Sequence, residues 1–72
     1  APDKQARKVC WAARDAYFAC LDRANIVDAN TPEADKACGE LVAQFKASCP
    51  SSWVEYFKTR RVLDARQRAM MA

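Results

Sequence analysis

Four cysteines constrain this 72-residue chain more than any other feature of its sequence. Nine residues separate Cys10 from Cys20, and ten separate Cys38 from Cys49. On a helix, residues spaced in this way lie about 15 to 16.5 Å apart along the axis. A disulfide requires Cα atoms within about 7 Å. Neither pair can therefore close on itself if each pair lies on one helix.

The sequence around these cysteines predicts two helices. Apolar residues recur on one broad helical face over about residues 3–24 and again over about 32–48. A polar turn at residues 25–31 separates the two segments. Thr31 is a suitable N-cap, and Pro32 suits the first helical position because no amide donor is needed there.

A third helix is expected after Pro50, which ends the second helix by pushing the residue before it out of helical geometry. Ser52 and Glu55 match a Ser-x-x-Glu capping box. We therefore expect this third helix over about residues 52–69.

Two pairings between the first two helices remain. Joining Cys10 to Cys38 and Cys20 to Cys49 would require parallel helices, but a seven-residue turn favours antiparallel neighbours. The sequence therefore predicts one all-α domain over residues 1–72, in which an antiparallel hairpin of about residues 3–49 carries two disulfides. The outer bond is Cys10–Cys49 and the inner bond is Cys20–Cys38. In the loop-entropy model, the outer bond stabilises the folded state by about 4 kcal/mol and the inner bond by about 3 kcal/mol, because each restricts the unfolded chain.

Local charge distinguishes the two expected bonds. Arg7 and Arg14 lie within one helical turn of Cys10, and Lys46 precedes Cys49 by three residues. Nearby cations stabilise thiolates. We therefore expect Cys10–Cys49 to be the more reducible bond and the redox candidate, with the inner bond a buried staple. Two purely structural bonds are the alternative.

Composition excludes several classes of site. The chain has no histidine, which removes the commonest metal ligand and acid–base group. Its cysteine spacing lacks the short knuckles of structural zinc sites. A net charge of +3 without a recognition motif argues against nucleic acid, and no apolar run is long enough for a membrane span.

Two segments carry a specific resemblance. Residues 7–22 contain Cys-Trp-x-x-Arg-Asp-x-aromatic-x-x-Cys-Leu-Asp, and residues 48–61 contain Cys-Pro-x-x-Trp-x-x-Tyr-Phe-x-x-Arg-Arg. Both patterns resemble the cytochrome c oxidase assembly factor 6 family, whose fold is the twin Cys-x9-Cys, or coiled-coil-helix-coiled-coil-helix, hairpin. The likeness extends over about residues 7–66.

The resemblance implies a protein of the mitochondrial intermembrane space that supports maturation of the binuclear copper site of oxidase subunit 2. It implies Sco-type copper metallochaperones as partners, and either thiol–disulfide exchange or copper(I) handling as the mechanism. No resident cofactor is expected. Copper(I) would bind at Cys10 and Cys49 in their reduced state, because soft thiolates suit this ion.

Two surface groups are candidates for partner contacts. Trp11 and Phe18 lie together on the first helix, beside Arg14. They predict an interface with a partner or a second copy, since exposed aromatic residues mark interfaces and the resembled family forms homodimers. The alternative is that the third helix covers them.

The third helix is basic, and Lys58, Arg60 and Arg61 predict a face for an acidic protein or anionic lipid. The alternative is a solvated face. At the level of function, an assembly factor is expected. A structural subunit of a respiratory complex is the alternative, and an oxidoreductase is disfavoured because the chain has no Cys-x-x-Cys motif.

Overall fold

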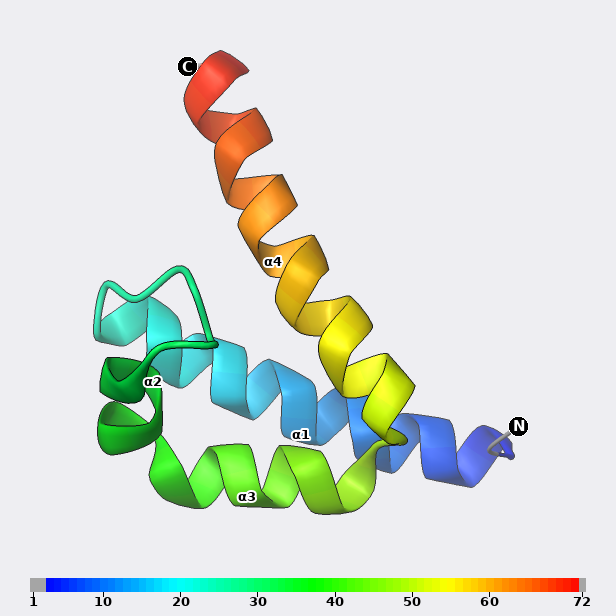
Figure 1. Cartoon of the computed structure of the whole chain (residues 1–72). Coiled ribbons are helices and arrows are strands. Elements are labelled where there is room, and N and C mark those ends of the chain that lie inside the picture. Colours follow the sequence, from blue (N-terminus) through cyan, green and yellow to red (C-terminus); the bar gives the residue numbers. More distant parts are fainter. Residues whose placement is uncertain (1–2, 72) are drawn as a thin grey trace.

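The computed structural model describes residues 3–71, and its helices form an antiparallel hairpin from which one long helix diverges (Figure 1). The helices in this part of the chain are α1 (Lys4–Arg23), α2 (Pro32–Ala37), α3 (Gly39–Ser48) and α4 (Ser51–Met71). Helices α1 and α3 lie side by side, whereas α4 leaves the end of α3 at an angle. None of these helices is both long and apolar enough to cross a membrane.

Both predicted disulfides are present and join the predicted partners. Cys10 and Cys49 have Cα atoms 4.9 Å apart, and those of Cys20 and Cys38 are 6.2 Å apart. The outer bond ties the first half of α1 to the end of α3, and the inner bond ties the end of α1 to the α2–α3 junction. The antiparallel hairpin is therefore confirmed.

The core lies between α1 and the α2–α3 arm. Tyr17, Leu21 and Phe45 are its largest fully buried side chains apart from the cysteines, and the Tyr17 and Phe45 ring centroids are 5.6 Å apart. Burial of each such side chain contributes about 1.5–3 kcal/mol. The other buried apolar residues are Cys10, Ala29, Ala34, Cys38, Val42, Cys49 and Val54.

Both ends of α1 are capped by local hydrogen bonds. The Asp3 carboxylate accepts from the Ala6 amide at 2.8 Å. At the other end Asn25 has φ 59°, a left-handed conformation that asparagine tolerates. The Ile26 amide then donates to the Leu21 carbonyl at 2.9 Å, which is a Schellman arrangement. The turn was expected only as a polar linker, and its geometry fixes where the chain leaves α1.

The second arm is not the continuous helix over 32–48 that the sequence predicts. Thr31 caps it and Pro32 occupies its first turn as expected, but the helix breaks at Cys38, whose φ and ψ are −132° and 33°. Cys38 bonds to Cys20, and Gly39 follows it. Glycine is a poor helix former, so a bend that brings Cys38 to α1 costs little at this position.

Helix α4 begins earlier and ends later than expected. Its first residue is Ser51, and the Val54 amide donates to the Pro50 carbonyl at 3.0 Å. Ser52 therefore lies inside the first turn, and the predicted capping box with Glu55 is wrong. Because Pro50 stands just before the helix, it separates α3 from α4 with only a short connection.

Arg61 links the middle of α4 to the end of α1 and the turn after it. Its guanidinium donates to the carbonyls of Ile26 and Val27 at 2.6 and 2.9 Å. It also pairs with Asp22 at 2.7 Å, and it lies 5.0 Å from the centroid of the Phe18 ring. A planar guanidinium can make all these contacts at once, which a lysine ammonium cannot match.

Tyr17 is fully buried, and its hydroxyl has no hydrogen-bond partner among the described residues. Burial raises the pKa of this phenol, the negative charge of Asp35 raises it further, and Arg61 partly opposes the shift. In the folded protein the hydroxyl therefore keeps its proton above the ordinary value of 10.0. The unfolded chain loses that proton first, so folding stability falls as the pH rises above about 10.

We expect Tyr17→Phe to raise the free energy of unfolding by about 1 kcal/mol at pH 7, because an unpartnered buried hydroxyl is removed. The variant should also lose the decline in stability above about pH 10. Urea titrations at pH 7 and in alkaline buffer, with disulfides intact, measure both effects. The matched control is Tyr56→Phe, at an exposed position, which should change neither quantity. A destabilised Tyr17→Phe protein would contradict this account of the core.

Candidate functional site

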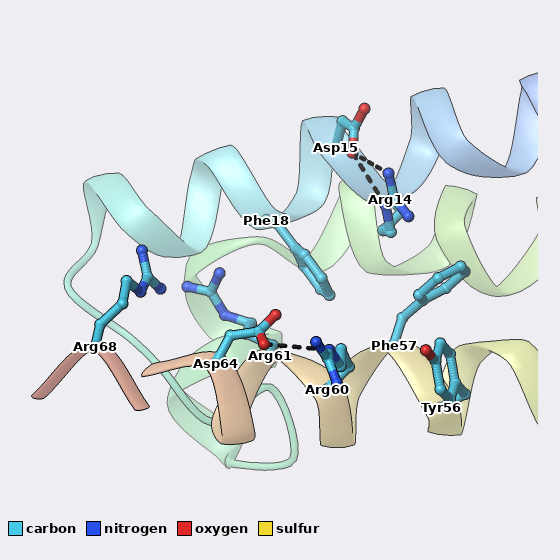
Figure 2. Close-up of a pocket in the computed structure, with 9 residues that line it drawn as sticks. All are labelled: Arg14, Asp15, Phe18, Tyr56, Phe57, Arg60, Arg61, Asp64 and Arg68. Atoms are coloured by element: carbon cyan, nitrogen blue, oxygen red, sulfur yellow. Dashed lines mark hydrogen bonds and ion pairs between the residues drawn. The ribbon is translucent and has the colours of Figure 1, made fainter. Parts of the chain in front are cut away.

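The outer disulfide is the more deeply buried of the two. Cys10 is 1% exposed and Cys49 is 7% exposed. Arg14, expected to favour a Cys10 thiolate, pairs with Asp15 at 2.8 Å and lies 4.7 Å from the centroid of Phe57 (Figure 2). The redox candidates Cys10 and Cys49 are thus brought together, but in a closed environment.

The inner disulfide is accessible on one side. Cys38 is buried, whereas Cys20 is only partly buried. The expectation of a buried inner bond is therefore wrong. The exposure lies on the Cys20 side of the bond, near the end of α1. A thiolate from another protein can approach a sulfur only where the sulfur is exposed, so accessibility favours the inner bond.

The candidate interface residues of α1 have different environments. Trp11 remains 43% exposed, beside Arg14, Trp53 and Tyr56 in a mainly apolar groove of about 510 Å³. Phe18 is partly buried against the core, with Arg61 over its ring. Helix α4 therefore covers Phe18 in part but leaves Trp11 open to solvent.

The predicted basic face of Lys58, Arg60 and Arg61 is not a single surface. The Arg61 side chain is 9% exposed and fully engaged with the turn. Lys58 is buried. Arg60 stays exposed and pairs with Asp64 at 3.1 Å, four residues later on α4. Lys58 and Arg61 are three residues apart and share one face of α4, where both side chains are largely buried, whereas Arg60 lies on another face and is exposed.

A groove between α1 and α4 collects charged residues that the sequence-based analysis did not group. It encloses about 390 Å³, and Figure 2 shows Phe18 and Phe57 reaching into it from opposite helices. Arg60, Asp64 and Arg68 line its α4 side. Their spacing of four residues was the signal that could have identified this stripe.

Comparison with known proteins places these features in a family. The family model described as "Cytochrome oxidase c subunit VIb" matches residues 1–72. Cytochrome c oxidase assembly factor 6 of Saccharomyces cerevisiae is 45% identical over 62 residues, which cover 81% of this chain and 60% of the yeast protein. No solved structure matches the chain significantly.

Mammalian relatives give the same result. The cytochrome c oxidase assembly factor 6 homolog of Bos taurus is 44% identical over 85% of this chain and 68% of its own length. The Homo sapiens homolog is also 44% identical over 85% of this chain, but the match spans only 43% of the human protein. The chain therefore belongs to the cytochrome oxidase c subunit VIb family and is similar to the proteins named cytochrome c oxidase assembly factor 6.

Proposed function

We propose that this protein acts in the assembly of cytochrome c oxidase in the mitochondrial intermembrane space. The observation that carries the proposal is the 41–45% identity to proteins named as assembly factors of this oxidase, over more than four fifths of the chain. Two disulfides in a helical hairpin suit an oxidising compartment. The proposed clients are Sco-type copper metallochaperones and the binuclear copper site of subunit 2.

Thiol–disulfide exchange is the proposed chemistry. In the reduced hairpin, one thiolate attacks a disulfide of the partner, forms a mixed disulfide and releases one partner thiolate, which takes up a proton. The second cysteine of the hairpin pair then attacks the mixed disulfide. The hairpin pair is oxidised by two electrons, and the partner leaves as a dithiol. The short Cα separations of both pairs support this step, because the resolving cysteine lies next to the attacking one.

Accessibility supports entry at Cys20 alone, because Cys38 is buried, whereas local charge supports Cys10 and Cys49 as the more reducible pair. These arguments concern different quantities. Exposure controls the rate at which a partner reaches a sulfur, and nearby cations control the stability of the thiolate. We propose that exchange with a partner begins at Cys20, the partly exposed residue of the four cysteines.

Copper(I) handling is the second candidate mechanism. In the reduced state, Cys10 and Cys49 would present two thiolates from backbone positions that are 4.9 Å apart in the oxidised protein. Paired thiolates are soft ligands that favour copper(I). Copper would be cargo in this scheme, and loading it requires the outer disulfide to open first.

The exchange proposal can be tested with two variants, each of which replaces one cysteine by serine and so leaves one free thiol beside one intact disulfide. Cys38→Ser leaves Cys20 as the only free thiol with the outer bond intact, and Cys10→Ser leaves Cys49 free with the inner bond intact. We expect Cys20 to react with an aromatic disulfide reagent at least about tenfold faster, because Cys20 is partly exposed and Cys49 is buried. Stopped-flow absorbance measures both rates, and circular dichroism checks the fold. Faster reaction of Cys49 would instead assign entry to the outer pair.

The family description also names an oxidase subunit, so a structural subunit of the mature complex is the alternative. An assembly factor should accompany incomplete oxidase and be depleted from the finished enzyme. We therefore expect an affinity-tagged copy, expressed in mitochondria, to be recovered in less than one-to-one ratio with purified active oxidase. Quantitative mass spectrometry of native gel bands measures this ratio. A one-to-one ratio in the mature enzyme would overturn the assembly proposal.

A homodimer through the exposed aromatic surface is part of the proposal. Trp11 and Trp53 lie at the mouth of the same apolar groove, and aromatic residues are enriched where proteins associate. Trp11→Glu should therefore lower the sedimentation mass toward that of the 8.1 kDa monomer. Val9→Glu, at an exposed site on the same helix outside this groove, is the matched control. An unchanged mass in Trp11→Glu would remove this surface from the dimer.

A further inference from the structure

The net charge of the protein resides entirely on α4. This helix carries five basic and two acidic residues, whereas residues 1–50 carry seven of each. The hairpin is thus electrically balanced, and the helix that diverges from it supplies the net +3. A segregated charge of this kind is typical of a surface that meets an oppositely charged partner.

The α1–α4 groove concentrates part of this charge in a concave space. Its lining includes four arginines, Arg14, Arg60, Arg61 and Arg68, against Asp15 and Asp64. The Arg60–Asp64 pair is exposed on both sides, so solvent screens it and a competing carboxylate can replace it at little cost. Arg68 is exposed and makes no ion pair within the described residues. Arg60 and Arg68 are therefore the cations that an incoming anion can reach.

The floor of the groove is aromatic and holds two of the guanidinium groups in place. Arg14 lies 4.7 Å from the Phe57 centroid and Arg61 lies 5.0 Å from the Phe18 centroid. Both groups already have partners, Asp15 for Arg14 and the turn after α1 for Arg61. They therefore contribute fixed positive charge to the groove and leave direct contact with an anion to Arg60 and Arg68. The exposed parts of the two rings provide apolar surface for a side chain between the carboxylates.

The shape and charge of the α1–α4 groove indicate which class of molecule can bind in it. A planar membrane surface cannot follow a groove between two diverging helices (Figure 1), whereas an extended peptide can. The α4 helix of a second copy carries the same positive charge, so docking of one α4 into the groove of another is unfavourable. We propose that the α1–α4 groove binds an extended acidic segment of another protein, with an apolar side chain among its carboxylates. This interaction does not depend on cysteine chemistry, because the oxidised protein presents the groove.

The test uses fluorescein-labelled peptides and the oxidised protein. The probe has four glutamates on each side of one leucine, and a second peptide replaces every glutamate with glutamine. Fluorescence anisotropy at low and physiological salt measures the binding of each. We expect the acidic probe to bind, the glutamine peptide to bind at least about tenfold more weakly, and salt to weaken the acidic probe's binding.

The variants locate the site. The double variant Arg60→Gln, Arg68→Gln should weaken binding of the acidic probe about tenfold or more. The double variant Lys8→Gln, Arg23→Gln removes the same charge from exposed positions outside the groove and should change binding less than about twofold. Circular dichroism confirms that both variants fold.

Three outcomes overturn the proposal. Equal losses in the two double variants would show attraction by net charge alone. Failure of the unmodified protein to bind the acidic probe would remove the groove as a peptide site. Anionic phospholipid vesicles that bind in place of the peptide, with loss in Arg60→Gln, Arg68→Gln, would assign the charge to a lipid surface.

Discussion

The two disulfides, one toward each end of the hairpin, fix the register between α1 and the α2–α3 arm. The packing of the core and the position of α4 both depend on that register. A chain this short buries too little surface to depend on packing alone. The outer bond spans 39 residues and the inner bond spans 18, so both remove much of the freedom of the unfolded chain. Tyr17 and Phe45 lie between the two bonds along the hairpin, and Leu21 lies just beyond the inner bond; there the helices are held close enough for these side chains to exclude water.

Helix α4 is attached in a different way. Pro50 and the outer disulfide fix its first turn, and Arg61 fixes its middle by polar contacts to the turn after α1. Between these two attachments the helix stands away from α1, and aromatic and arginine side chains line the space that remains (Figure 2). The proposed peptide groove therefore results from how α4 is tethered, and it does not require a large core.

The parts of the fold that follow from regular geometry could be predicted from sequence. Cysteine spacing along a helix, together with the seven-residue turn, was enough to derive both disulfides, and Thr31 with Pro32 located the start of the second arm. The break at Cys38 was missed, because the apolar pattern of residues 32–48 is local and does not show how the arm bends where Cys38 meets Cys20. The contacts of Arg61 were missed for the same reason, since its partners lie 34 to 39 residues away. The partial exposure of Cys20 likewise depends on how the helices pack around it, which a local sequence pattern does not show.

The length of α4 gives its two attachments unequal control of the helix. The helix has 21 residues and is about 30 Å long, and its covalent attachment is the two-residue connection of Cys49 and Pro50. Arg61 holds it about 15 Å farther along, near half its length. The polar contacts of Arg61 therefore oppose rotation of α4 about Pro50 with a long lever arm, so one side chain far from the joint sets the angle at which the second half of the helix leaves the hairpin.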